Sequence, residues 1–399
     1  MLRPATILLA SAAVMATASA WAQDRSAVHL FVADHTDAVV HAIDAGTAKV
    51  LARFETASPA TLYATESGRT VFAVQRDGNR VTAFSSGIEL DDHGDHGDIE
   101  IETPKALGLE IAGERPVHLV EHHGDVALFF DGEGVARIVR EGDVLEGRAQ
   151  VREVATQAPH HGVAISYGDH VVVSWPNRTD PTKNPDGVRV VDAAGAQVGA
   201  DVDCPNLHGE ASSGNLLAIA CQTGLLLVEA KGGEPEITHL PYAAGLPRDT
   251  KVSTLLAGKG LQYFLGNFGA SAVVLIDPQD EEAFRLVELP MRRVHFAVDP
   301  VRVKFAYVFT EDGQLHRLNV LSGRISDSLA LTQPYSMDGH WSEPRARVAV
   351  GGDEIFVTDP LAGKIHVVDA ATFTKVREIA VPGKPFNIAA VAGSGETHD

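Results

Sequence analysis

The sequence predicts an all-β protein folded as a β-propeller of eight blades, with seven blades as the alternative if one weakly marked period is an insertion. A short apolar strand that ends in a polar residue recurs at intervals of roughly 40 to 50 residues, the length of one four-stranded blade. A turn glycine precedes seven of the eight copies, as a tight hairpin requires. The copies are Val39–Asp44, Val81–Ser85, Val135–Arg140, Val188–Asp192, Leu225–Glu229, Ala272–Asp277, Leu315–Asn319 and Ile365–Asp369.

The composition agrees with this fold class and narrows the possible ligands. Hydrophobic residues make up 45% of the chain, which is enough for a large core, while 37 glycines and 20 prolines divide it into short segments. The formal net charge of -20 repels nucleic acid and anionic lipid and favours cations or basic partners. We therefore exclude nucleic acid as a ligand.

The two ends of the chain fit a closed ring. Val28 to Glu55 contains three strands, so the first blade lacks its innermost one, and Phe386 to Val391 is a strand left over at the other end. Pairing the two would close the ring without a free sheet edge. We expect residues 23–399 to form one domain. Its insertions at 87–103 and 175–185 are predicted to be mobile loops, because neither is expected to bury apolar surface.

The first 22 residues are predicted to be a signal peptide. Arg3 provides the positive charge, residues 7–15 form an apolar stretch too short to span a bilayer, and Ala20-Trp21-Ala22 matches a cleavage site. Cleavage would follow Ala22. No later stretch approaches the roughly 20 apolar residues of a membrane helix, so we expect an exported protein without membrane insertion.

The two cysteines are predicted to form a structural disulfide. Residues 206–212 and 216–221 read as the arms of a hairpin that turns at Ser213-Gly214, and this pairing places Cys204 almost opposite Cys221. A cysteine ligand to a metal is the alternative. An oxidising compartment favours the disulfide.

Three histidines occupy similar places in consecutive repeats. His118 lies in Pro116-Val117-His118, His161 in Pro159-His160-His161-Gly162, and His208 in Asn206-Leu207-His208-Gly209. Counted back from the third strand of each blade, all three lie near the start of an innermost strand and should converge at the axis. Three convergent imidazoles are typical of a zinc site. His295 has the same register without histidine neighbours and is predicted to be structural, as are His41, His316 and His366 on outer strands.

Other side chains could complete this site or hold a second ion. Candidates beside the three histidines are His122, His123, His160 and Glu210, and a later irregular segment, 333–344, adds Asp338 and His340. The acidic insertion contains His93 and His96 among four aspartates, and we interpret it as a low-affinity arm that captures zinc, the alternative being a solvated acidic loop.

Taken together, the signal peptide, the propeller repeat, the paired His-His-Gly motifs and the His/Asp-rich insertion resemble the AztD family of periplasmic zinc metallochaperones. The resemblance covers nearly the whole mature chain. It implies a periplasmic propeller with bound zinc (Zn2+) that hands the ion to the solute-binding protein of a zinc ABC transporter. We expect such a protein to act as a monomer.

A metalloenzyme is the main alternative function, because propellers also house hydrolases such as lactonases. Glu210 or Glu121 could then serve as a general base beside the same histidines. The sequence contains no G-x-S-x-G, C-x-x-C-H or H-E-x-x-H motif. We therefore expect a protein that is not an enzyme. A scaffold without metal would leave the clustered histidines unexplained.

Overall fold

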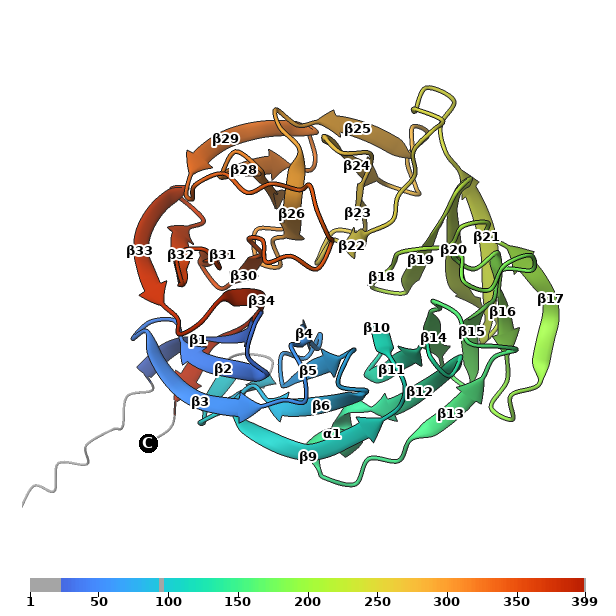
Figure 1. Cartoon of the computed structure of the whole chain (residues 1–399), viewed down its shortest axis with the longest axis horizontal. Helices are drawn as coiled ribbons and strands as arrows, with labels where there is room; N and C mark the ends of the chain where they lie inside the picture. Colours follow the sequence, from blue (N-terminus) through green and yellow to red (C-terminus); the bar gives the residue numbers. More distant parts are fainter. Residues whose placement is uncertain (1–22, 93–96, 398–399) are drawn as a thin grey trace, which may run out of the picture.

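The computed structural model of the chain is an eight-bladed β-propeller, as predicted (Figure 1). It describes residues 23–92 and 97–397. The predicted signal peptide, residues 1–22, and the segment with His93 and His96 lie outside the described residues. Each blade contains four antiparallel strands, two further strands extend the sheet of blade 1, and the blades surround a central axis in chain order.

The strands of each blade follow one another from the axis outward, except that the last strand of the chain opens blade 1. Blade 1 is β34 (Pro385–Thr397), β1 (Gln23–Asp34), β2 (Val39–Asp44) and β3 (Lys49–Glu55); blade 2 is β4 (Thr61–Ala64), β5 (Thr70–Gln75), β6 (Arg80–Ser85) and β9 (Lys105–Ala112); blade 3 is β10 (Pro116–His122), β11 (Asp125–Phe130), β12 (Val135–Arg140) and β13 (Arg152–Ala155); blade 4 is β14 (Ala164–Tyr167), β15 (His170–Trp175), β16 (Gly187–Val191) and β17 (Gln197–Asp203). Blade 5 is β18 (Glu210–Ser213), β19 (Leu216–Cys221), β20 (Gly224–Lys231) and β21 (Glu234–Pro241); blade 6 is β22 (Leu255–Ala257), β23 (Phe264–Asn267), β24 (Ala272–Ile276) and β25 (Phe284–Glu288); blade 7 is β26 (Arg293–Val298), β27 (Phe305–Thr310), β28 (Gln314–Asn319) and β29 (Arg324–Ala330); blade 8 is β30 (Val348–Gly351), β31 (Glu354–Asp359), β32 (Lys364–Asp369) and β33 (Thr374–Ala380). A hairpin of β7 (Ile88–Asp92) and β8 (Gly97–Ile101) connects β6 to β9, and the short helix α1 (Glu141–Leu145) connects β12 to β13.

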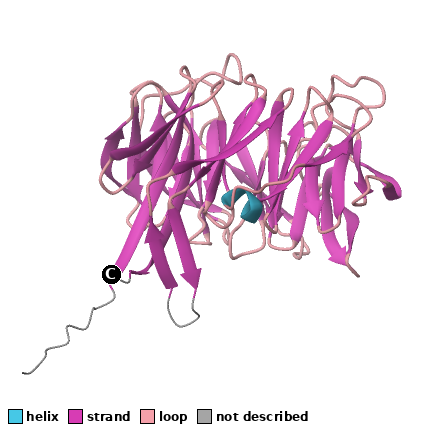
Figure 2. Cartoon of the chain, turned by 90° about the horizontal axis from the view of Figure 1, so that it is seen from below, coloured by secondary structure: helices cyan, strands magenta, loops and turns pink. Residues whose placement is uncertain are grey.

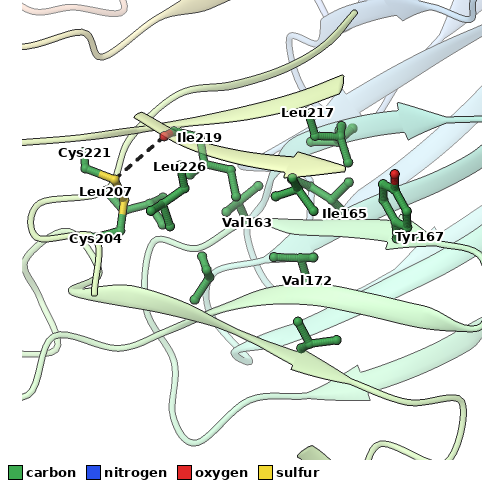
Figure 3. Close-up of a cluster of buried hydrophobic side chains, with 14 residues drawn as sticks. Val163, Ile165, Tyr167, Val172, Cys204, Leu207, Leu217, Ile219, Cys221 and Leu226 are labelled. Atoms are coloured by element: carbon green, nitrogen blue, oxygen red, sulfur yellow. Dashed lines mark hydrogen bonds between the residues drawn. A yellow bond between two sulfur atoms is a disulfide. The ribbon is translucent and has the colours of Figure 1, made fainter. Parts of the chain in front are cut away.

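The core lies between neighbouring blades. Second strands such as β5 and β19 are buried along their whole length because both of their faces pack against adjacent sheets. Outermost strands such as β29 alternate between exposed and partly buried residues, the period of a strand with one solvated face. Figure 3 shows the cluster between blades 4 and 5, where Ile165, Leu217 and Leu226 are fully buried.

The disc has two different faces. We call upper the face at which the innermost strands begin, and lower the face at which they end. The connections between blades and the turns from second to third strands lie on the upper face. The β7–β8 hairpin connects a third strand to a fourth, so it projects from the lower face (Figure 2).

The ring closes as the sequence predicted. β34 pairs antiparallel with β1, with Val28 opposite Ala392 and Val32 opposite Ile388, and so supplies the missing innermost strand of blade 1. At the upper end of this seam, Asp34 accepts hydrogen bonds from the backbone N–H groups of Thr36 and Lys384. The first and last strands of the described chain therefore form one sheet.

The prediction that residues 87–103 form a loop without apolar contacts was wrong. Ile88 and Ile99 are buried against Val391, and β8 pairs in parallel with β34 through Asp98 and Glu396. The isoleucines alternate with acidic residues at a period of two, which is a strand pattern that the acidic composition obscured. The insertion at 175–185 also differs from expectation, because Trp175 is buried and ends β15.

Gly383 provides a test of the seam. Its φ is +77°, and a Cβ at this position would overlap the carboxylate of Asp34. We expect Gly383→Ala to destabilise the fold by about 1–2 kcal/mol from the backbone and about 1–3 kcal/mol more from the overlap. The control is Gly232→Ala, since Gly232 has φ +65° and no atom within 4 Å of such a Cβ. Urea unfolding would contradict this account of the seam if both variants lost equal stability.

Candidate metal centre

The three histidines predicted to converge do so at the upper face. His118 is the third residue of β10, while His161 and His208 lie in the connections that lead into β14 and β18. They come from blades 3, 4 and 5. Each offers one ring nitrogen to a cluster in which all three atoms lie within 4.8 Å of one another.

The spacing of the ring nitrogens fits one zinc ion. Nε2 of His161 lies 3.2 Å from Nε2 of His118 and 3.3 Å from Nε2 of His208. A tetrahedral zinc ion with bonds of about 2.0–2.1 Å separates two ligand nitrogens by about 3.3–3.4 Å. Two of the three nitrogen pairs are therefore already at about the distance that a shared zinc ion requires, and all three ligand atoms lie within 4.8 Å of one another. A tetrahedral ion bound in this way would have one open position.

A fixed acceptor holds the other nitrogen of each ring. The Nδ1 atoms of His118 and His161 lie 2.8 Å from Glu210 Oε1 and 2.6 Å from Asp131 Oδ2. His208 Nδ1 lies 2.6 Å from the carbonyl oxygen of Ser253. Ionised carboxylates and carbonyls only accept hydrogen bonds, so each Nδ1 carries the proton and donates it. In the neutral rings, Nε2 is then the atom with a free lone pair for a metal.

The charges around the cluster favour a cation. The side chains of Glu210 and Asp131 are only 8% and 7% exposed. Glu210 Oε2 and Asp131 Oδ1 are buried without a hydrogen-bond partner in the described residues. Two buried carboxylates in this state need a positive charge nearby. A divalent ion bound to three neutral imidazoles would balance them.

Without a metal, part of this positive charge is a proton. Burial alone would lower the pKa of His118, but the charge of Glu210 and its hydrogen bond outweigh burial, so the pKa of His118 is raised. Burial likewise opposes ionisation of Glu210, yet the charge of His118 lowers the pKa of this carboxyl group. The pKa of His208 is lowered to about 4, first by burial and then by the charge of His118. These shifts favour a proton on His118 opposite an ionised Glu210, and they favour a neutral His208.

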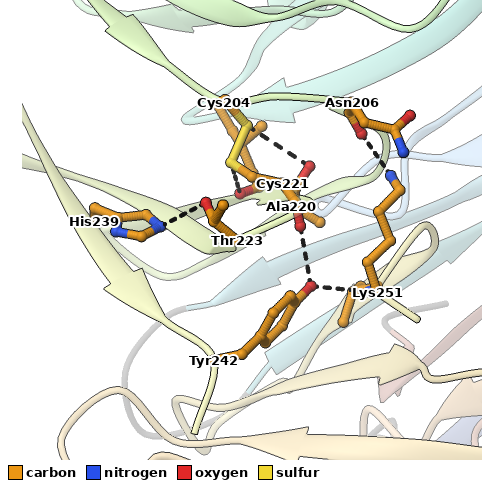
Figure 4. Close-up of a disulfide and its surroundings, with 10 residues drawn as sticks. Cys204, Asn206, Ala220, Cys221, Thr223, His239, Tyr242 and Lys251 are labelled. Atoms are coloured by element: carbon orange, nitrogen blue, oxygen red, sulfur yellow. Dashed lines mark hydrogen bonds between the residues drawn. A yellow bond between two sulfur atoms is a disulfide. The ribbon is translucent and has the colours of Figure 1, made fainter. Parts of the chain in front are cut away.

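The predicted disulfide is present and supports the His208 segment. Cys204 and Cys221 are bonded, which ties the chain just before His208 to the end of β19 (Figure 4). Tyr242 donates a hydrogen bond to the carbonyl oxygen of Cys221 and accepts one from the backbone N–H of Val252, beside Ser253. A cross-link over 17 residues contributes about 3 kcal/mol in the chain-entropy model. It holds in place both the third histidine and its acceptor.

The register of the hairpin differs slightly from the prediction. β18 begins at Glu210 instead of Asn206, and Ser213 pairs with Leu216, so the turn lies at Gly214-Asn215. Cys204 therefore precedes the strand, and the chain between them forms the connection that carries His208.

Several predicted donors do not join the cluster. Both ring nitrogens of His160 are engaged, by the carbonyl oxygen of Ala158 at 2.8 Å and by Ser174 Oγ at 2.9 Å, and burial lowers its pKa, so its role is structural. His122 and His123 do lie together, with ring centroids 4.1 Å apart. They are four and five residues beyond His118, about 13 Å further along the strand.

The remaining candidates are further away or already paired. Asp338 forms an ion pair with Arg292 at 2.9 Å, and His340 Nδ1 lies 2.6 Å from Ser342 Oγ. Glu210 contacts His118 through Oε1, while its Oε2 has no hydrogen-bond partner in the described residues. His295 accepts a hydrogen bond from the backbone N–H of Val348, which agrees with its predicted structural role. His93 and His96 lie outside the described residues.

Comparison with known proteins identifies the family. The chain is 53% identical over 376 residues to the zinc chaperone AztD of Citrobacter koseri, a match that covers 94% of this chain and 89% of that protein. The chain belongs to the AztD family. Crystal structures of Citrobacter koseri AztD match with a TM-score of 0.92 at 53% identity, and in the apo form 0.89 at 50% identity, each covering 94% of this chain and 100% of the other. No family model matches.

A more distant structure shares the fold. Dihydro-heme d1 dehydrogenase NirN in complex with DHE matches with a TM-score of 0.57 at 15% identity, over 91% of this chain and 74% of that one. The AztD relative is named as a chaperone, in agreement with the expectation that the chain is not an enzyme.

Two supports of the AztD-family site were missed from the sequence. Asp131 lies in the turn between β11 and β12, just before the turn glycine Gly134. Polar residues are common in turns, so its position did not indicate a role in the site. Ser253 contributes through its backbone carbonyl, which any residue would provide, so its side chain carries no signal in the sequence. One signal in the sequence could have indicated Asp131. It is an acidic residue in the turn between the second and third strands of blade 3, on the upper face, and the next blade along the chain carries His161.

Substitution of the two carboxylates tests their support of the rings. Glu210→Gln and Asp131→Asn keep an oxygen acceptor but remove the charge, and we expect each to weaken zinc binding by about 10- to 100-fold. Glu121→Gln is the matched control, since Glu121 lies on β10 but accepts its hydrogen bond from the backbone N–H of Glu66. Competition against a chromophoric chelator gives the affinities. Wild-type affinity in both carboxylate variants would show that the charges do not matter.

Zinc affinity should also depend on pH. Because the pKa of His118 is raised, a proton on its Nε2 competes with zinc already above about 6.5, the ordinary histidine value. We expect affinity to be highest at alkaline pH and to fall as the pH drops through this region. In Glu210→Gln, the fall should begin at lower pH because the charge that raises the pKa is gone. Competition titrations between about pH 5.5 and 8.5 check this, and a flat profile contradicts it.

Proposed function

We propose that this protein is a zinc metallochaperone that binds one zinc ion through His118, His161 and His208 and passes it directly to the solute-binding protein of a zinc ABC transporter. The single observation that carries the proposal is that His161 Nε2 lies 3.2 Å and 3.3 Å from the Nε2 atoms of His118 and His208, which is the spacing of two ligands on one zinc ion. The name of the Citrobacter koseri relative, a zinc chaperone, supports the same assignment.

The ligand set suits an ion that must be held and then released to a protein. Three imidazoles leave a fourth tetrahedral position that a ligand from an acceptor can occupy. Each zinc–nitrogen bond can then be replaced in turn, so zinc need not enter solution. The His161 side chain is 31% exposed and that of His118 is 18% exposed. Of these two ligands, His161 is therefore better suited to be the first that an acceptor replaces on the zinc ion.

The proposed location is the periplasm, with cleavage after Ala22. The disulfide supports an oxidising compartment. Within the described residues, no helix has the length and apolar character needed to cross a bilayer. The formal charge of -20 is consistent with a protein that attracts cations and basic partners. We propose that it acts as a monomer.

A hydrolase using the same histidines has less support. Catalytic zinc needs a free general base beside its bound water, whereas Glu210 Oε1 is engaged with His118. Glu121, the other candidate base, has a pKa raised to about 7 by burial, but it follows His118 by three residues along β10 and faces Glu66. Burial opposes ionisation of Glu210, but the charge of His118 lowers the pKa of this carboxyl group and so makes it a weaker base, while Glu121 is directed at another partner.

Direct transfer can be distinguished from dissociation by its dependence on concentration. Zinc-loaded protein is mixed with the metal-free solute-binding protein or with a chelator of equal affinity. We expect transfer to the solute-binding protein to accelerate with its concentration and to exceed release to the chelator by about tenfold or more, because a shared-ligand intermediate lowers the barrier. An unrelated zinc-binding protein is the control. Equal, concentration-independent rates for all three would refute direct transfer.

A further inference from the structure

A second pocket lies on the upper face beside the candidate metal centre. It has a volume of about 480 Å³ and lies between blades 5, 6 and 7. Ser253, whose carbonyl oxygen holds the His208 ring, lines this pocket, and so does Asn206, two residues before His208. A ligand in the pocket would therefore sit next to the segment that positions the third histidine.

Two cations in this pocket have no anionic partner. Lys251 Nζ donates a hydrogen bond to the carbonyl oxygen of Asn206 at 2.6 Å (Figure 4). Arg293 donates to the carbonyl oxygens of Gly269 and Ala272 at 3.1 and 3.2 Å. Within the described residues, neither forms a salt bridge, and Asp249 is the one acidic residue among those that line the pocket. The charges of Lys251 and Arg293 are thus available to a ligand.

The surroundings make these charges unfavourable without a ligand. Burial lowers the pKa of Lys251 to about 8, and burial together with the charge of Arg292 lowers the pKa of Arg293 to about 10. Both shifts mean that the protein itself compensates these cations poorly. Neighbouring Arg292 differs, since it pairs with Asp338. An unpaired basic pocket in a chain of charge -20 is best explained by an anion that binds there.

We infer that Lys251 and Arg293 bind a carboxylate beside the zinc site. The carboxylate would come from a small organic acid or from an acidic side chain of a protein that docks on the upper face. A guanidinium and an ammonium group hold carboxylates through charge-assisted hydrogen bonds. The choice of carboxylate rests on the proposed function, because a carboxylate is also a ligand that zinc accepts.

The test is calorimetric titration of the metal-free protein with succinate and, separately, with a tetraglutamate peptide, at constant ionic strength in a buffer without other oxyanions. We expect saturable binding of at least one probe, weakened tenfold or more in Lys251→Gln and in Arg293→Gln. Arg248→Gln is the matched control, because Arg248 is an exposed cation in the same connection that does not line the pocket. It should bind as wild type does.

The outcomes distinguish a small acid from a protein side chain as the source of the carboxylate, and they separate this inference from the proposed zinc transfer. Binding of succinate shows that a small acid is sufficient, and binding of the peptide alone assigns the site to a protein side chain. Lys251→Arg keeps the positive charge and should retain binding. Binding by this variant would show that a loss in Lys251→Gln comes from the lost charge and not from a failure to fold. Absence of binding by both probes to wild type, or equal binding by Lys251→Gln, overturns the inference. Normal zinc transfer in that case would leave the proposed function intact.

Discussion

The candidate metal centre depends on hydrogen bonds that cross from one blade to another. His118 of blade 3 is held by Glu210 of blade 5, His161 of blade 4 by Asp131 of blade 3, and His208 by Ser253, which precedes blade 6. No ring is held by its own sheet alone. The convergence of the three Nε2 atoms is consequently a property of the assembled propeller, and packing between blades fixes the ligand geometry more firmly than any single loop could.

Sequence periodicity was sufficient to place the fold and the three histidines, because both follow the repeat. Register counted from the third strands predicted which of the 18 histidines face the axis. It could not find Asp131, since a turn carboxylate becomes a hydrogen-bond partner only through the spacing between blades. It also could not show the hydrogen bond between Glu210 and His118, because that contact depends on the packing of blades 3 and 5. The β7–β8 hairpin was missed because acidic composition was weighed above a period-two pattern of isoleucine and leucine.

The upper face combines opposite charges at short range. Buried carboxylates surround the histidines, while two cations without carboxylate partners line the adjacent pocket, and Ser253 belongs to both. A cation and an anion can therefore occupy neighbouring places without neutralising the same side chains.

Closure of the ring by β34 also constrains how the molecule folds. The innermost strand of blade 1 follows β1 by more than 350 residues in the chain, and the two strands must pair. Until then β1 has an unpaired edge and blades 1 and 8 lack their shared packing. Contacts of such long sequence separation form late, and all the residues that hold the three imidazoles precede them in the chain. A folding chain therefore has an open sheet edge at β1 until this late pairing is made, which makes the seam a point exposed to misassembly between copies.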